Sequence, residues 1–587
     1  MTQRKFLTEE EMRRALEESD DENYVFRETD SEDEDFVVDR ASDIENDLTE
    51  AASEADDEQL WSDNEDAIQE QELKNYNNPI VEYVGKDGTK WKAEPEKASR
   101  TPQHNIIGGG IHKVVLPPGQ VIHDPIDSFN LFFNQHILEL IVKYTNSEAK
   151  GVLQNKWKPI DTIELQAFLG LLLTTGVNKQ GNVDFREYWD PIFGNPIFRA
   201  SMGKNRFAAI QRFLRFDDKT TRSLRKSNDK LAPIRELWED INRKLRKFYL
   251  PGENLTIDEQ LIPFRGRVSF KQYLPSKPDK YGMKMWWICD SKTSYPLSGI
   301  PYLGKDGQNR AENLAQTVVQ KLSEPYYRSN RNITFDNYFT SLELAKSLFH
   351  NGLTMVGTMR KNKRCIPQNF QPSKTRNIET NIFGFCKNIT LVSYVPRKNR
   401  AVIFLSTMHH TNEVDIANKS KSEINLYYNA TKGGVDTLDQ LAHEYTVRRK
   451  TNRWPVAFFQ NIIDVVGVAS LIIWKNLYPT WNQRKPYSQR KIFLREVATQ
   501  LVTPHIIRRG KKGLTKYHIA AIQDVAGPSQ QQAAVQPTEA VVKRKKRCHI
   551  CPSKISRNSK QCCDKCNLNV CSEHSAKKII CVNCLPK

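Results

Sequence analysis

Three short segments of this chain each carry an aspartate in a setting that suits metal chemistry. Asp258 and Asp336 lie in or at the end of apolar, β-prone runs, and Asp436 follows the pair Gly433-Gly434 at the start of a predicted helix. Aspartate is depleted from strands because it is small, charged and competes for backbone hydrogen bonds. Its presence in two of them therefore indicates a compensating role, and binding divalent cations is one such role.

Hard cations such as Mg²⁺ take oxygen ligands and keep several waters, so a few converging carboxylates and substrate phosphate oxygens suffice to hold them. Two such ions can stabilise the attacking and leaving oxygens of an in-line phosphoryl displacement. Taken singly, each aspartate is better explained as the cap of a turn or helix. The matching strand settings of Asp258 and Asp336 favour a shared role for the set.

The charge of the chain is divided between its two ends. Residues 1–70 contain 27 acidic and 6 basic residues, a net charge of −21, whereas the whole 587-residue chain carries +17. The remaining 517 residues therefore carry +38. A strongly basic segment that follows an acidic one predicts a polyanionic partner. We favour nucleic-acid binding over the alternative, a basic protein that is soluble and has no such partner.

Cysteine usage and hydropathy point to the inside of the cell. Only three of the eleven cysteines, Cys289, Cys365 and Cys386, precede the last 40 residues. The other eight cluster there, which indicates metal binding more than a secreted disulfide framework. No charge-free apolar run is long enough to span a bilayer, and the N-terminus does not resemble a signal peptide, so we expect no membrane partner.

The predicted elements change character along the chain. Residues 1–117 are expected to be a disordered acidic tail. Helical stripes begin near Pro125, and β-prone runs follow Pro251-Gly252. Alternating helices and strands then complete an α/β unit that includes Asp258 and Asp336, and a second β-rich stretch separates this unit from the Asp436 helix.

Seven motifs give the chain a close resemblance to the piggyBac family of DNA transposases, from about residue 123 to the C-terminus. They are Thr-Ile-Asp-Glu-Gln (256–260), Phe-Arg-Gly-Arg (264–267), Lys-Tyr-Gly (280–282), Pro-Tyr-Leu-Gly (301–304), Asp-Asn-Tyr-Phe (336–339), Thr-Lys-Gly-Gly-Val-Asp-Thr-Leu-Asp-Gln (431–440) and Arg-Lys-Thr-Asn-Arg-Trp-Pro (449–455). The resemblance implies an α/β multidomain protein: an RNase H-like catalytic domain with a β-rich insertion, a split helical dimerisation and DNA-binding domain, and a C-terminal zinc domain.

The same resemblance implies the catalytic residues and the reaction. Asp258, Asp336 and Asp436 would hold two Mg²⁺ ions, with Asp439 as an additional essential acid. Because Asp436 and Asp439 lie three residues apart on one helix face, the sequence does not decide which of them contacts metal. In the implied cut-and-paste reaction, the transposon end is nicked, the freed 3′-hydroxyl attacks the opposite strand to make a hairpin, and the resolved ends insert at a TTAA target.

Four further positions are expected to contact DNA. The resemblance assigns Arg360 and Lys363 to target DNA and integration, although charge alone also fits a solvated basic loop. Arg453 beside Trp454 could stack on DNA or pack the start of a helix.

The C-terminal segment predicts two zinc sites. Its spacing is Cys548-x₂-Cys551-x₁₁-Cys563-x₂-Cys566-x₄-Cys571-x₂-His574-x₆-Cys581-x₂-Cys584. Four ligand pairs in a segment too short to build a core predict two tetrahedral zinc ions per chain. We favour cross-brace ligation, with Cys548, Cys551, Cys571 and His574 on one ion and Cys563, Cys566, Cys581 and Cys584 on the other. Sequential pairing is the alternative, and Cys562 is left over.

These expectations give domain boundaries and a ranking of functions. The boundaries are 1–117 for the acidic tail; 118–253 and 448–524 for the split helical domain; 254–365 and 425–447 for the catalytic domain; 366–424 for the insertion; 525–547 for a linker with a basic nuclear-localisation run; and 548–587 for the zinc domain. An active transposase, dimeric and nuclear, that binds terminal inverted repeats in double-stranded DNA ranks first. A domesticated piggyBac-derived chromatin or DNA-binding protein without transposition ranks second, and a ubiquitin ligase ranks far below.

Overall fold

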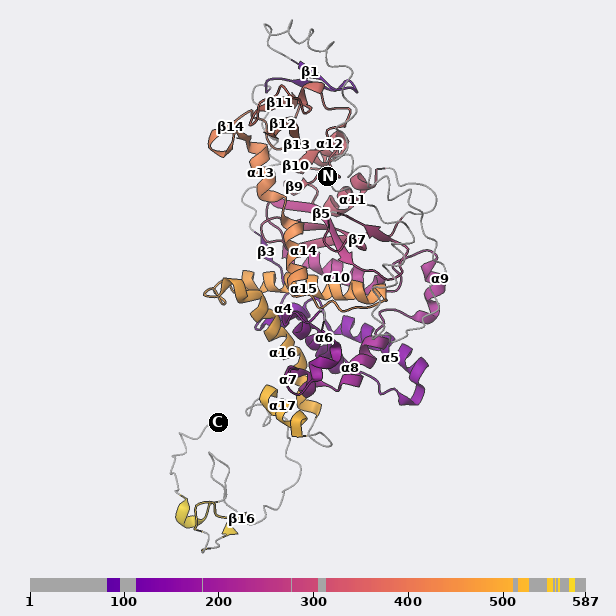
Figure 1. The fold of residues 1–587 in the computed structure, drawn as a ribbon, viewed down its shortest axis with the longest axis vertical. Coiled ribbons are helices and arrows are strands. Elements are labelled where there is room, and N and C mark those ends of the chain that lie inside the picture. Colours follow the sequence, from indigo (N-terminus) through magenta and orange to yellow (C-terminus); the bar gives the residue numbers. More distant parts are fainter. Residues whose placement is uncertain are drawn as a thin grey trace, which may run out of the picture. The chain divides into compact units, whose positions relative to one another are not determined.

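We describe the fold from a computed structural model, in two compact units, residues 1–525 and 526–587, each taken by itself (Figure 1). The structure describes residues 82–95, 112–181, 183–275, 277–304, 313–509, 516–526, 546–552, 555, 558–559 and 570–575.

One large mixed sheet organises the first unit. Its eleven strands among the described residues are β1 (Glu82–Val84), β2 (Lys90–Lys92), β5 (Asn254–Pro263), β6 (Lys271–Tyr273), β7 (Tyr281–Asp290), β8 (Pro296–Pro301), β9 (Asn332–Phe335), β10 (Thr354–Met359), β11 (Asn381–Cys386), β12 (Ile389–Arg397) and β13 (Arg400–Ser406). The order is β1-β2-β11-β12-β13-β10-β9-β5-β7-β6, and β8 pairs with β7. β9 runs parallel to both β5 and β10, and the other pairs are antiparallel. The segments that carry Asp258 and Asp336 are therefore neighbours in the middle of the sheet.

The β-rich stretch expected at 366–424 extends this same sheet. β13 pairs with β10 along Val356–Met359, and β12 and β11 follow in turn. Val356, Val392 and Phe404 share one buried cluster with Ile424 and Tyr428 of the next helix. The strands of this stretch therefore share a core with β10, the strand that follows Asp336. The predicted domain boundaries stay predictions.

The expectation of disorder up to residue 117 differs from the structure at residues 82–95. These residues form the β1–β2 hairpin, in which Tyr83 lies opposite Trp91. Trp91 is fully buried, which gives the hairpin an apolar anchor that the acidic composition of the tail conceals. Residues 113–114 also form a short strand, β3 (Lys113–Val114), paired with β4 (Tyr249–Leu250).

Helices from two distant parts of the chain form a second layer. Its members are α4 (Pro125–Asn130), α5 (Gln135–Leu153), α6 (Thr162–Val177), α7 (Pro196–Ser201), α8 (Lys204–Phe213), α9 (Arg222–Lys226), α10 (Arg235–Lys247), α15 (Trp454–Leu477), α16 (Gln489–Arg509) and α17 (Lys516–Ala526). α6 packs along α16, and Figure 1 shows α16 beside α4 and α6. A Cβ on Gly170 of α6 would lie 2.8 Å from the carbonyl oxygen of Ala498, so this glycine permits the close approach of the two segments.

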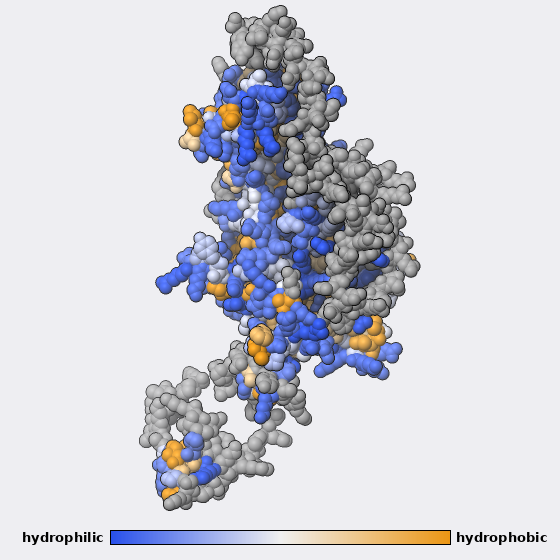
Figure 2. All heavy atoms as spheres, viewed as in Figure 1, coloured by the Kyte–Doolittle hydropathy of each residue, from blue (hydrophilic) through white to orange (hydrophobic). Residues whose placement is uncertain are grey.

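The longest apolar helix among these is a core helix. α15 is long and apolar enough to cross a membrane by length and composition, but 89% of its most apolar 18-residue window is buried inside the fold. Its Asp464 accepts hydrogen bonds from Thr446 Oγ1 and the Val447 amide, and burial raises the pKa of this carboxyl to about 7. In Figure 2 the described residues on the visible face are mainly hydrophilic.

Four further helices come between or after the strands of the sheet in chain order. They are α11 (Leu314–Ser323), α12 (Leu342–His350), α13 (Glu423–Thr431) and α14 (Gly434–Glu444). α12 begins at the Ser341 cap, whose hydroxyl accepts from the Leu344 amide. α14 packs against β5 and β7 and carries Asp436 and Asp439. It brings the third predicted site segment to the strand that carries the first.

Candidate active site and metal centre

Asp258 and Asp336 arise at the same level of two adjacent parallel strands. Ile257 of β5 is paired in register with Phe335, the last residue of β9. Asp258 is the next residue within β5, and Asp336 is the residue that directly follows β9. Neighbouring strands lie about 4.8 Å apart, so the two carboxylates start from adjacent backbone positions. The pairing of β5 with β9 therefore brings together two residues that are distant in sequence.

A repeated Thr-x-Asp pattern turns both aspartates toward one face. Thr256 and Thr334, two residues before the aspartates, are also paired in register. The Thr256 hydroxyl donates to the Thr431 carbonyl oxygen at 2.7 Å, and Thr334 Oγ1 lies 2.7 Å from Thr431 Oγ1. Since side chains alternate along a strand, Asp258 and Asp336 share the face on which Thr431 lies.

Helix α14 crosses this same face along β5. A Cβ on Gly434 would lie 2.6 Å from Thr256 Oγ1, so glycine is required where the helix begins. Further along, the Gln260 amide donates from Nε2 to Asp439 Oδ1 at 2.8 Å. Asp258 lies between these two contacts on the strand, and Asp436 lies between them on the helix.

The three predicted metal ligands affect one another electrostatically. Burial raises the pKa of Asp258 well above its usual value, and the charges of Glu259, Asp336 and Asp436 raise it further. Burial, followed by the charge of Glu259, raises the pKa of Asp336 to about 6. A cluster of carboxylates whose charged forms are disfavoured gains stability when cations bind.

Cations surround the cluster at its edges. The charges of Lys284 and Arg360 lower the pKa of Asp336 against the effect of burial. Lys277 Nζ donates to the Glu259 carbonyl oxygen and lies 4.0 Å from Asp436 Oδ1. These side chains partly compensate the acidic charge.

Asp436 and Asp439, which the sequence did not distinguish, differ in their surroundings. The Asp436 side chain is 65% exposed. Asp439 is engaged by Gln260, and burial raises its pKa while that hydrogen bond lowers it. Asp436 is therefore the more accessible oxygen donor, and Asp439 is the one already positioned by the protein.

The donor set fits a hard cation that keeps some of its own waters. Among the described residues, only one group of metal-binding side chains has ligand atoms all within 4.8 Å of one another, and it contains none of these aspartates. The aspartates are close enough for the charges of Asp336 and Asp436 to act on Asp258, but their oxygens do not form such a tight group. Mg²⁺ suits such an open set of carboxylate oxygens, because waters and substrate phosphates complete its coordination.

Gln260 is a site residue that we did not single out from the sequence. It is buried, and its Oε1 accepts from Trp287 Nε1 at 3.0 Å and from Asn461 Nδ2 at 3.2 Å while its Nε2 donates to Asp439. Every contact uses the amide in one orientation. Gln260 therefore links β7 and α15 to the acidic helix α14.

Replacing Gln260 by Leu should impair both the site and the fold. We expect strand cleavage to fall about 10- to 100-fold, as for the loss of other residues that orient site ligands. We also expect a loss of about 1–3 kcal/mol in unfolding free energy, because the Trp287 indole N–H and the Asp439 carboxylate lose their partner. Thermal unfolding and cleavage assays measure the two effects. Gln272→Leu, on the partly exposed strand β6, is the matched control, and equal losses in both variants would contradict this role.

The predicted DNA-binding residues fall in two places. Arg360 directly follows β10, and Lys363 is exposed in the same loop. The Arg453 guanidinium donates to the carbonyl oxygens of Gln211, Arg212 and Leu214 at the end of α8. The Trp454 ring lies edge-on to Phe270, 5.2 Å between centroids. Arg453 and Trp454 thus join the start of α15 to neighbouring segments, and DNA contact by all four stays a prediction.

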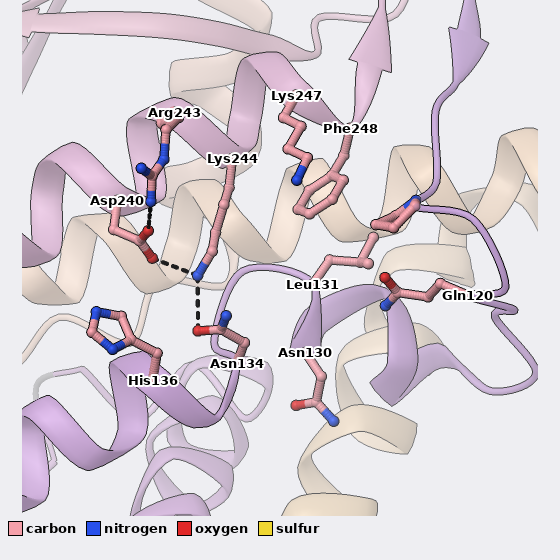
Figure 3. A pocket seen from close by; sticks show the side chains of 11 residues that line it. Gln120, Asn130, Leu131, Asn134, His136, Asp240, Arg243, Lys244, Lys247 and Phe248 are labelled. Atoms are coloured by element: carbon pink, nitrogen blue, oxygen red, sulfur yellow. Dashed lines mark hydrogen bonds and ion pairs between the residues drawn. The ribbon is translucent and has the colours of Figure 1, made fainter.

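A pocket of about 590 Å³ lies between α10 and the α4–α5 connection, lined by none of these aspartates. Lys244 is buried there between Asp240 and Asn134 (Figure 3). Burial lowers the pKa of Lys244. Since the lysine already has a carboxylate and an amide as partners, it holds these helices together.

Four of the predicted zinc ligands meet in the second unit. Cys548, Cys551, Cys571 and His574 have ligand atoms within 4.8 Å of one another. The Cys551 and Cys571 sulfurs are 3.7 Å apart, and His574 Nδ1 is 3.2 Å from the Cys571 sulfur. Tetrahedral zinc with bonds of about 2.3 Å places sulfurs about 3.8 Å apart, so the set fits this ion.

This group is the first ligand set of the cross-brace arrangement. Sequential pairing would put Cys563 and Cys566 with Cys548 and Cys551 in place of Cys571 and His574. The second predicted set, Cys563, Cys566, Cys581 and Cys584, lies outside the described residues, as does Cys562. The second ion therefore stays a prediction.

The first unit has a mixed sheet with an acidic cluster on its middle strands and a helical layer built from two parts of the chain. The second unit has a Cys/His group that could hold a metal. Together they define a multidomain α/β protein with two candidate metal centres. Residues 124–470 match the family described as Transposase IS4. This is more than half of the chain, and the chain belongs to this family, in its piggyBac branch.

Two human relatives and one solved structure show the extent of the similarity. The chain is 29% identical over 286 residues to "PiggyBac transposable element-derived protein 3", covering 46% of this chain and 45% of that protein. It is 23% identical over 369 residues to "PiggyBac transposable element-derived protein 2", covering 58% and 60%. The chain thus spans about half the length of the curated relatives it matches.

The structural match is wider. The chain in "Cryo-EM structure of piggyBac transposase synaptic complex with hairpin DNA" is 36% identical, with a TM-score of 0.66. The match covers 79% of this chain and 98% of that chain.

Proposed function

We propose that this protein is a cut-and-paste DNA transposase whose catalytic groups are Asp258, Asp336, Asp436 and Asp439, on an RNase H-like domain. The observation that carries the proposal is the register of β5 with β9, which sets two of these aspartates side by side on the face crossed by α14. Membership of a transposase family and the match to a piggyBac synaptic complex support the reaction class.

The residues divide the work at the site. Two Mg²⁺ ions bound by the aspartates would stabilise the attacking and leaving oxygens of an in-line phosphoryl displacement. Asp258, Asp336 and Asp436 would supply the oxygen donors, and Gln260 holds Asp439 in place. Lys277 and Lys284 lie beside the carboxylates and would meet the negative charge of a DNA phosphate.

The partner is double-stranded DNA, at transposon terminal inverted repeats and at a TTAA target. The charge of +38 outside the acidic segment supports a polyanionic partner, and the relative solved with hairpin DNA supports hairpin-forming cleavage. We further propose that the zinc unit, with the basic run 543–547 before it, recognises the transposon end. A homodimer in the nucleus is the expected state.

A second function is favoured by the names of the human relatives, which describe proteins derived from transposable elements. In a domesticated protein the fold and the DNA contacts would persist without transposition. The acidic set is complete in this chain, which favours the active enzyme.

Purified full-length chain, Mg²⁺ and labelled duplexes that carry candidate terminal repeats next to TTAA test the proposal. Nicks and hairpin products on denaturing gels are expected from the active transposase. Mobility shifts without cleavage would indicate the domesticated protein. The absence of both shifts and cleavage products would show that the DNA assignment is wrong.

A further inference from the structure

The β1–β2 hairpin docks on the residues that directly follow the basic loop, which we define as Arg360–Arg364. This hairpin lies outside the part of the chain that matches the transposase family, residues 124–470. Its partner residues, Cys365, Ile366 and Pro367, are buried, whereas residues 361–364 are exposed. The loop is therefore a cationic segment fixed at one end by β10 and at the other by the hairpin.

The contacts between hairpin and loop are made mostly by backbone groups. The Trp91 indole Nε1 donates to the Cys365 carbonyl oxygen at 2.8 Å in a buried hydrogen bond. The Asp87 amide donates to the Arg364 carbonyl oxygen at 3.3 Å, and Gly85 forms a β-bridge with Pro367. Such contacts depend on the path of the loop backbone, so they hold that path in place.

The fit tolerates no side chain at Gly85. A Cβ there would lie 2.6 Å from the Cys365 carbonyl oxygen and 2.9 Å from that of Arg364. Tyr83 packs edge-on against Phe370, 5.2 Å between ring centroids, just beyond the docked segment. The hairpin thus contacts both the end of the loop and the residues that follow it.

The other end of the loop reaches the acidic site. Arg360 lies over the Tyr338 ring, 6.0 Å from its centroid, and its charge lowers the pKa of Asp336. Within the loop, the Lys363 amide donates to the Arg360 carbonyl oxygen and the Ile366 amide to that of Lys363. A shift at Cys365 would therefore pass through two short turns to the cations beside the aspartates.

We propose that Trp91 and Gly85 are positioning residues for DNA, which act by holding the basic loop in the conformation that receives target DNA. A plain structural alternative is that the hairpin only covers the edge of β11, to which β2 pairs. The two roles differ in consequence, because edge protection affects the whole enzyme whereas loop positioning affects one step. The proposal rests on the proposed function of the basic loop in integration.

The test compares Trp91→Phe with Trp157→Phe in the full-length chain. Both tryptophans are buried and donate an indole hydrogen bond, Trp157 to Asn146 Oδ1 at 3.0 Å in the helical layer. Trp91→Phe keeps the apolar ring and removes the donor to Cys365. Cleavage of transposon ends and transfer of pre-cleaved ends to a TTAA plasmid are measured separately, with Arg360→Ala/Lys363→Ala as the comparator.

We expect Trp91→Phe to lower strand transfer about tenfold, because the buried Cys365 carbonyl oxygen loses its hydrogen-bond donor. Cleavage should change by less than about twofold. Trp157→Phe should leave the ratio of transfer to cleavage unchanged. An equal loss of both steps in Trp91→Phe, or no loss, would overturn the positioning role.

Hydrogen exchange separates this proposal from the function on which it rests. Amide exchange at Lys363 and Ile366 should be about tenfold faster in Trp91→Phe and unchanged in Trp157→Phe. Unchanged exchange in Trp91→Phe would refute the docking role whatever the activity. Exchange could be faster in Trp91→Phe while Arg360→Ala/Lys363→Ala transfers strands normally. That result would show that the loop has no role in integration, and it would also refute the proposal that the hairpin positions the loop for DNA.

Discussion

Asp258→Asn should abolish strand cleavage while the protein still folds and still binds transposon-end DNA. An ion held at this site would contribute several kcal/mol to transition-state stabilisation. At about 1.4 kcal/mol per tenfold in rate, loss of its ligand lowers cleavage by about 10³-fold or more. Nicking of a labelled terminal-repeat duplex measures the loss, and gel shifts in Ca²⁺ measure the binding that should remain. Asp336→Asn should behave in the same way.

The same substitution should make the metal-free protein more stable. The pKa of Asp258 is raised above its unfolded value, so its carboxylate destabilises the fold at pH values above that unfolded value. Asn removes this charge and its repulsion with Asp336 and Asp436. Thermal unfolding should therefore begin at a higher temperature in Asp258→Asn without metal, and added Mg²⁺ should raise that temperature less than in the wild type.

Asp415→Asn is the control for a lost carboxylate away from the site. Asp415 is a partly exposed cap of the turn at Ile416–Asn418, so its replacement should change cleavage by less than about twofold. Cleavage that survives in Asp258→Asn, or that falls equally in Asp415→Asn, would contradict the assignment of the aspartates.

The sequence allowed the central strands and helices to be predicted because their patterns are local. Apolar patterning predicts strands over 255–263 and 283–289 and a helix over 342–350. β5 begins one residue before the first of these strands, β7 extends the second by two residues at its start and one at its end, and α12 has the predicted bounds. The sequence could also place an aspartate in each of two strands. It could not give their register, because register depends on partners far away in the chain.

What remained hidden depends on contacts between distant segments. In the sequence, Gln260 is one of several polar residues of β5, and only the fold shows that Trp287, Asn461 and Asp439 surround it. The β1–β2 hairpin had a local signal, Asp87-Gly88 between β-prone residues, and Gly88 adopts a φ of +86°. The acidic composition of the preceding residues obscured that signal.

Replacing Cys571 by Ser should remove one zinc ion per chain and sequence-specific DNA binding with it. The segment is too small to build a core, and structural zinc contributes about 10–16 kcal/mol to folding of such modules. Affinity for terminal-repeat DNA should then fall to the non-specific level, a loss of about 10³-fold or more. Zinc content by mass spectrometry and binding to matched and scrambled duplexes measure the two effects. Cys562→Ser changes the leftover cysteine and should retain both ions.

Paired substitutions distinguish the two ways of dividing the ligands. If the group in the structure is one site, Cys548→Ser/Cys571→Ser damages a single site and leaves one zinc, whereas Cys571→Ser/Cys581→Ser damages both sites and leaves none. Sequential pairing gives the reverse result, because Cys548 and Cys571 would then belong to different ions. The sulfur and nitrogen distances of 3.2–3.7 Å around Cys571 favour the first outcome, since they already match a single tetrahedral ion. One retained zinc in the Cys571/Cys581 pair would show that the cross-brace assignment is wrong.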